Sequence, residues 1–179
     1  RLLEVNIIKD SFDLMRESYI QGIEMTEELT GQVVMTKEQL NEAFNILNTI
    51  IPASITIGVA LLALALISIN LPLLKRFKID VPKFQQFKYM RLPKAVLWYY
   101  LIVLIVTIFV NPEVGTPLYV ITLNFSLVLW ILLTLQGVSF LYFLIDEKEL
   151  PKFLKVLTAF FSIPFYSIIL LVGVFDLGF

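Results

Sequence analysis

Four long apolar runs without charge are the feature that most restricts how this chain can fold. They lie at about residues 50–74, 95–110, within 116–145, and at 156–175. A helix needs roughly 20 largely uncharged residues to cross a bilayer core of about 30 Å, and it satisfies its own backbone hydrogen bonds there. The hydrophobic content of 58% also exceeds the roughly 45–50% that is usual for soluble domains. We therefore expect an all-α, polytopic membrane helix bundle with four transmembrane helices.

Two of these runs have features of their own. The run at 95–110 is the shortest of the four and needs the aromatic residues that precede it to complete a crossing. The last run contains Pro164, which lacks a backbone N–H and is expected to kink the helix.

Basic residues are distributed unevenly over the loops. Residues 75–94 contain seven Lys or Arg residues and the single acid Asp80, whereas the connection at 111–116 carries only Glu113. Cytoplasmic loops are enriched in Lys and Arg, so residues 75–94 and 146–155 are predicted to be cytoplasmic in a multi-pass cell-membrane protein. Residues 1–49 are then extracytoplasmic, as one domain before the transmembrane domain 50–179.

The loop at 75–94 mixes its cations with aromatic residues directly before an apolar run. This pattern predicts a membrane elbow, a short interfacial segment on the cytoplasmic face, followed by aromatic residues at headgroup level. A nucleic-acid groove is disfavoured because its aromatic residues lead straight into the bilayer. The candidate surface for a membrane or cytoplasmic protein partner comprises Lys75, Arg76, Phe84, Phe87, Arg91 and Lys94.

Residues 1–49 are acidic and carry a helical apolar pattern. An apolar stripe with alternating three- and four-residue steps predicts an amphipathic helix that ends near Gly31. Thr36 and Gln39 form a capping-box pattern at the start of a second helix. We expect an amphipathic helical hairpin outside the membrane, with a simple linker as the alternative. The stripe, a candidate extracytoplasmic partner surface, is Val5, Ile8, Phe12, Met15 and Tyr19.

The residue types that carry most enzyme chemistry are scarce. The sequence has no cysteine and no histidine, and none of the four proposed spans contains a charged residue. Phosphate-loop, HExxH and GxSxG patterns are also absent. We therefore expect no enzyme activity, no metal site and no cofactor.

Uncharged polar side chains inside the spans are the remaining candidates for binding. Asn124 and Gln136 are the most costly to leave in lipid, so they are candidate ligand-binding residues of an outward-facing pocket. The alternative is that each one hydrogen-bonds a neighbouring helix. Aromatic residues that could form the wall of such a pocket are Trp98, Tyr99, Tyr100 and Trp130.

Three stretches, "RLPKAVLWYYLIVLI", "LQGVSFLYFLI" and the terminal "GVFDLGF", resemble the C-terminal half of the YybS-like family of bacterial membrane proteins. Members of that family are about twice as long, which agrees with a first residue of Arg1 and implies a fragment of a longer protein. The family is distantly similar to the substrate-binding membrane subunits of energy-coupling-factor transporters. That similarity implies a small-molecule pocket and a cytoplasmic coupling partner.

Two functions remain open at this point. The first is a non-enzymatic transporter subunit that binds a small molecule or lipid within the bundle. The second is a membrane scaffold or assembly protein of a cell-envelope complex, with protein partners on the elbow and on the hairpin.

Overall fold

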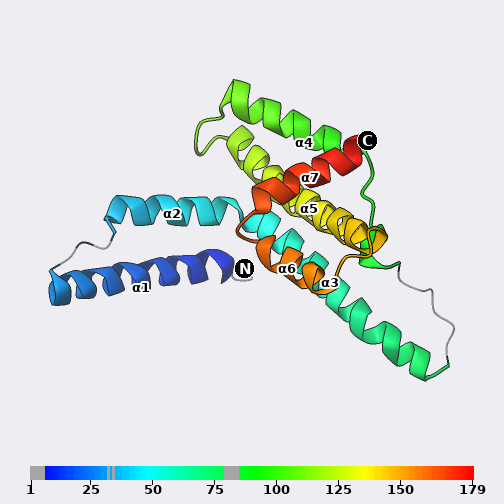
Figure 1. The fold of residues 1–179 in the computed structure, drawn as a ribbon. Coiled ribbons are helices and arrows are strands. Elements are labelled where there is room, and N and C mark those ends of the chain that lie inside the picture. Colours follow the sequence, from blue (N-terminus) through cyan, green and yellow to red (C-terminus); the bar gives the residue numbers. More distant parts are fainter. Residues whose placement is uncertain (1–6, 32, 34, 79–84) are drawn as a thin grey trace, which may run out of the picture. The chain divides into compact units, whose positions relative to one another are not determined.

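The computed structural model describes residues 7–31, 33, 35–78 and 85–179, and every regular element in these ranges is a helix. The predicted all-α fold class is confirmed. The chain divides into two compact units, residues 1–51 and 52–179 (Figure 1), and each is described here by itself.

The first unit contains α1 (Ile7–Thr30) and α2 (Lys37–Thr49), and both helix ends follow local sequence signals. Gly31 has a positive φ of 66°, and its N–H bonds to the carbonyl of Glu27, which closes α1. At the start of α2, Thr36 accepts from the N–H of Gln39, and the Gln39 side chain accepts from the N–H of Thr36. The predicted capping box is confirmed.

Side chains of α1 meet side chains of α2 in an antiparallel order. The Arg16 guanidinium donates to the Oδ1 of Asn41, at 2.5 Å from Nη2, and Lys37 pairs with Glu24 at 2.6 Å. Phe44 is buried in edge-on contact with two aromatic rings of α1. Two polar contacts and an aromatic cluster therefore hold the two helices together.

The second unit begins with α3 (Ile51–Arg76), followed by the short 3₁₀ helix η1 (Phe87–Tyr89). Next come α4 (Ala95–Ile105) and its π-helical extension η2 (Val106–Val110), which ends at Asn111 in the left-handed conformation. Thr116 caps α5 (Pro117–Glu147) by accepting from the N–H of Tyr119, and Pro117 occupies the first turn. The last helices are α6 (Phe153–Phe161) and α7 (Tyr166–Gly178).

The predicted count of four transmembrane helices is not confirmed. Among the described residues, α3 and α5 are long and apolar enough to cross a membrane. The segment Ala95–Val110 is shorter, about 24 Å at 1.5 Å per residue. The last predicted span is divided into α6 and α7, which are bent by 111° around Pro164, far more than a kink. The described residues thus hold two candidate spans, or three if the bent pair counts as one.

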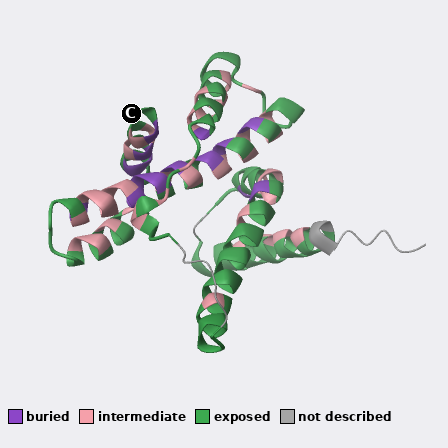
Figure 2. Cartoon of the chain, turned by 90° about the vertical axis from the view of Figure 1, so that its right-hand side faces the viewer, coloured by how far each residue is buried: buried purple, intermediate pink, exposed green. Residues whose placement is uncertain are grey.

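The core of the second unit lies along α5 (Figure 2), where Leu133 is fully buried. The closest approach is between α5 and α7, and it depends on two glycines. A Cβ on Gly137 would overlap the carbonyl oxygen of Ile169, and a Cβ on Gly173 would overlap the carbonyl oxygen of Leu133. Small residues at such crossings allow backbones to approach within a membrane.

In contrast, α3 is exposed along nearly its whole length (Figure 2). It joins the rest of the unit near its first turn, where Ala53 is buried and donates its N–H to the Oδ1 of Asn124 at 2.8 Å. Its apolar side chains are therefore available to lipid or to another protein.

Candidate functional site

The segment 85–94, here called the elbow, is attached to α5 by two buried polar side chains. Gln136 and Ser139 are each 1% exposed and stand three residues apart on one face of the helix. The Oε1 of Gln136 accepts from the N–H of Leu92 at 2.9 Å, and its Nε2 donates to the carbonyl of Met90 at 3.2 Å. The Ser139 hydroxyl donates to the carbonyl of Phe87 at 2.6 Å. These bonds satisfy elbow backbone groups that would otherwise lose water on burial.

A carboxylate from α7 completes this cluster. The Oδ2 of Asp176 accepts from the Nε2 of Gln136 at 2.5 Å. Sequence reasoning missed Asp176 because it ended the last span at Phe175. The available signal was spacing, since Asp176 follows Gly173 by three residues and shares the helix face that packs on α5.

A second polar group lies at the end of α5. The Asp146 carboxylate pairs with Lys88 of the elbow at 2.8 Å and with Lys155 of α6 at 2.5 Å. The hydrogen bond to Asp146 raises the pKa of Lys88 above its ordinary value, so this lysine is charged at neutral pH. Asp146 therefore ties the elbow and the start of α6 to one end of α5.

A cavity of roughly 230 Å³, here called the elbow cavity, opens between the elbow, α5 and α7. Its charged side chains are two cations of the elbow, Lys88 and Arg91, and the acid Asp176. Its volume is below the roughly 300–1,000 Å³ of pockets for drug-sized ligands, so it suits a small polar group. The remaining lining residues are Gln85, Tyr89, Met90, Ser139, Phe140 and Phe143.

The residues predicted to bind a ligand are not gathered in one place. Asn124 and Gln136 are twelve residues apart on α5, about 18 Å along its axis, and Asn124 bonds Ala53 and Val120. Both side chains thus join elements of the unit, as the alternative interpretation expects. The predicted aromatic wall is dispersed: Trp98 is 65% exposed, Tyr99 is also exposed, Tyr100 packs against the core, and Trp130 lies beside Tyr166.

Residues of the predicted cytoplasmic surface have different surroundings. Lys75 and Arg76 are exposed at the end of α3, and Lys94 is exposed before α4. Phe87 contacts the ring of Tyr142, with 5.6 Å between ring centroids, and Arg91 lines the elbow cavity. The remaining member, Phe84, is outside the described residues.

The predicted partner stripe of α1 is partly used within the first unit. Phe12 and Tyr19 contact Phe44 of α2, whereas Met15 is exposed. Of the other two members, Val5 lies outside the described residues and Ile8 is described only as part of the helix backbone.

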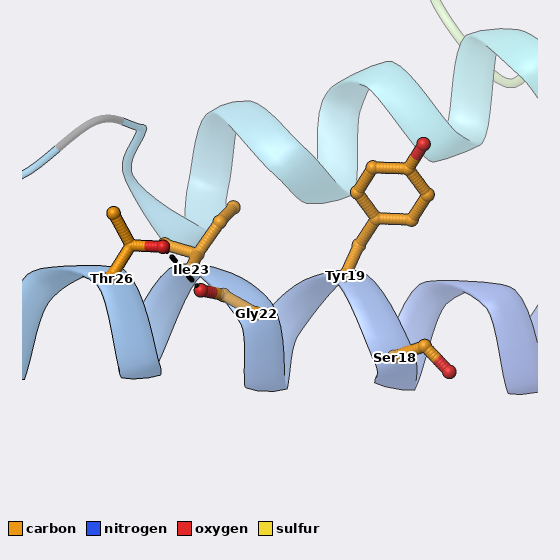
Figure 3. A pocket seen from close by; sticks show the side chains of 5 residues that line it. All are labelled: Ser18, Tyr19, Gly22, Ile23 and Thr26. Carbon is orange, nitrogen blue, oxygen red and sulfur yellow. Dashed lines mark hydrogen bonds between the residues drawn. The ribbon is translucent and has the colours of Figure 1, made fainter.

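A further cavity, of roughly 330 Å³, lies along α1 (Figure 3). Its lining side chains are uncharged, and the Thr26 hydroxyl already donates to the carbonyl of Gly22 at 2.8 Å. It is a weaker candidate than the elbow cavity because it offers few free polar groups. Its lining residues are Ser18, Tyr19, Gly22, Ile23 and Thr26.

The long apolar helices α3 and α5 agree with what the comparisons with known proteins found. Residues 1–177 match the family model described as "Predicted membrane protein (DUF2232)". The chain belongs to this family. The chain is also similar to the uncharacterized protein YybS of Bacillus subtilis (strain 168), with 30% identity over 185 residues.

That alignment covers all of this chain and 59% of YybS, so the chain spans somewhat more than half the length of its relative. The predicted membership of the YybS-like family is confirmed. No solved structure matches the chain. The similarity to energy-coupling-factor transporters therefore stays a prediction.

Proposed function

We propose that this DUF2232 member is a non-enzymatic integral membrane protein whose elbow cavity binds a small molecule or a lipid headgroup, as a subunit of a transport system. The observation that carries the proposal is the convergence of Lys88, Arg91, Asp176 and the buried Ser139 on one small cavity at the edge of an apolar bundle. A well-formed pocket with a few convergent polar groups is the default candidate for a binding site.

The orientation proposed from the loops has support from the Asp146 ion pairs. Lys88 belongs to the basic loop 75–94, and Lys155 belongs to the loop 146–155. Because one carboxylate contacts both, the two basic loops lie at the same end of the second unit. We assign this end to the cytoplasm, where a protein partner would meet Lys75, Arg76 and Lys94, and we assign residues 1–49 to the other side.

The bent pair α6–α7 fits a re-entrant path better than a crossing. Lys155, at the start of α6, reaches Asp146 beside the elbow, and Asp176, near the end of α7, lines the elbow cavity. A straight helix over these 21 residues would separate its ends by about 32 Å. Asp176 instead bonds Gln136, which lies ten residues, or about 15 Å, along α5 from Asp146, so the pair turns back within the bundle and ends short of the outer end of α5.

A scaffold is the second candidate, and the exposure of α3 favours it. No residue is buried in the most apolar stretch of α3. A Cβ added at Gly58 would have no other atom within 4 Å. Ser54 and Gly58 have the small-xxx-small spacing that allows another helix to approach closely. This face would then bind another membrane helix.

The test is native mass spectrometry of the protein after gentle extraction from its own membrane. Gln85 lines the elbow cavity and Gln86 does not, so Gln85→Trp should block binding and Gln86→Trp should serve as the matched control. We expect a small molecule that is retained by the wild type and the control and lost from Gln85→Trp. A copurifying membrane protein, with no small molecule in any sample, would favour the scaffold.

A further inference from the structure

The charged groups that line the elbow cavity differ in how far their charges are already compensated. Lys88 is paired with Asp146 at 2.8 Å. Arg91 is exposed and makes no ion pair with any described residue. Asp176 accepts one bond from Gln136 and has no cation within ion-pair distance in the described part of the chain. One cation and one carboxylate of the cavity are thus open to a ligand.

These two groups require complementary charges from the ligand. A guanidinium presents a planar fork of donors that matches the oxygens of a phosphate. A carboxylate has further lone pairs after accepting one hydrogen bond, and an ammonium group can donate to them. The Phe140 and Phe143 side chains supply an apolar wall beside these polar groups.

We propose that the elbow cavity recognises a zwitterion in which a primary amine and a phosphate are joined by a short linker. Asp176 accepts from the amine, and Arg91 binds the phosphate. The inference rests on the proposed function, because it names the ligand of the same cavity. The headgroup of phosphatidylethanolamine and free phosphoethanolamine share this chemistry.

Size and location agree with this class of ligand. The volume of roughly 230 Å³ suits a headgroup more than a vitamin-sized molecule. The elbow carries exposed apolar and aromatic residues next to its cations, as segments at the headgroup level of a bilayer do. A bound headgroup can therefore leave its acyl chains in the lipid.

The experiment compares lipid retention by native mass spectrometry after reconstitution in nanodiscs. One set contains phosphatidylethanolamine and another contains phosphatidylglycerol with the same acyl chains, which keeps the phosphate and removes the amine. The wild type should retain several-fold more phosphatidylethanolamine. Asp176→Asn, whose amide oxygen can still accept from Gln136, should lose this preference, and Arg91→Gln should retain less of both lipids. Lys152→Gln removes an exposed cation that does not line the cavity and forms no ion pair with any described residue, and it should behave as the wild type.

A second arm titrates free phosphoethanolamine into detergent-solubilised protein and follows the melting temperature. A higher melting temperature with free phosphoethanolamine, without a preference for phosphatidylethanolamine, identifies a soluble zwitterion as the ligand. A preference for phosphatidylethanolamine without a change in melting temperature identifies the lipid headgroup. Equal retention of both lipids with no response to phosphoethanolamine would overturn the zwitterion assignment. If another molecule is still lost from Gln85→Trp and kept by Gln86→Trp, the cavity remains a binding site and only its ligand class is wrong.

Discussion

At the scale of single residues, the glycine crossing between α5 and α7 gives the sharpest prediction. In Gly137→Ala the new Cβ would overlap the carbonyl oxygen of Ile169 and lie 2.9 Å from its Cγ2. A backbone atom cannot rotate away, so the helices must separate. We expect a loss of about 1–3 kcal/mol in the free energy of unfolding, as for other overpacked cores. This loss can be measured by denaturant-induced unfolding of the protein in detergent.

Gly58→Ala is the matched control, because a Cβ at Gly58 meets nothing within 4 Å. Alanine has the higher helix propensity, so this variant should be unchanged or more stable by up to about 1 kcal/mol. Equal destabilisation by the two substitutions would mean that the crossing is not a tight contact.

The pair Gln136 and Asp176 leads to a second prediction. Gln136→Leu removes the acceptor of the Leu92 N–H and the donor to Asp176, leaving partly buried polar groups without these partners. Such a loss typically costs about 1–3 kcal/mol. In the double variant with Asp176→Leu, the orphaned carboxylate is absent as well. Its destabilisation should be smaller than the sum of the two single losses, and strict additivity in unfolding measurements would argue against the contact.

At the scale of elements, Asp146 connects the elbow, α5 and α6. Asp146→Asn removes both ion pairs, so hydrogen exchange in residues 85–94 should become faster, and added salt should reduce the difference between wild type and variant. Glu147→Gln changes an exposed neighbour in neither ion pair and should leave the exchange rate unaltered.

The pH dependence of this connection follows from the raised pKa of Lys88. A raised pKa means that the contribution is fully present below the ordinary lysine value of 10.5 and is lost only as the pH rises through the higher folded value. The protection of the elbow's backbone amides from hydrogen exchange should therefore be constant across neutral pH. A loss of protection near pH 7 would contradict the Lys88 pairing.

Elements with local causes could be predicted from the sequence, and elements that depend on distant contacts could not. The Thr36 capping box and the stop at Gly31 each depend on a few adjacent residues. The division of the last apolar run is different: Pro164 marks the break, but the 111° bend lets α7 pack on α5 through Gly173 and Gly137, which are distant in sequence. Asp176 lay one residue beyond the predicted span, and its bond to Gln136 of another helix is also a contact between residues distant in sequence.

At the scale of the whole molecule, two kinds of surface separate the roles of the helices in the second unit. The helices α5 and α7 share a buried interface with polar groups at its edge. In contrast, no residue is buried in the most apolar stretch of α3, so its apolar side chains are exposed. A ligand site belongs to the first kind, because its polar groups are positioned by packing. A lipid-facing or partner-facing role belongs to the second.

Membrane orientation is the prediction that tests this arrangement as a whole. The sequence contains no cysteine, so a single introduced cysteine reports its own position without background. Gln86→Cys in the elbow and Lys148→Cys after α5 should react with an impermeant reagent only from the cytoplasmic side, and Val114→Cys only from outside.

The path of the pair α6–α7 can be tested in the same way. If the pair is re-entrant, Phe179→Cys reacts from the cytoplasmic side, as Gln86→Cys and Lys148→Cys do. Labelling of Phe179→Cys together with Val114→Cys would instead make the bent pair a broken crossing. Labelling of Gln86→Cys and Lys148→Cys from opposite sides would contradict the Asp146 ion pairs themselves, because one carboxylate cannot contact lysines across a bilayer.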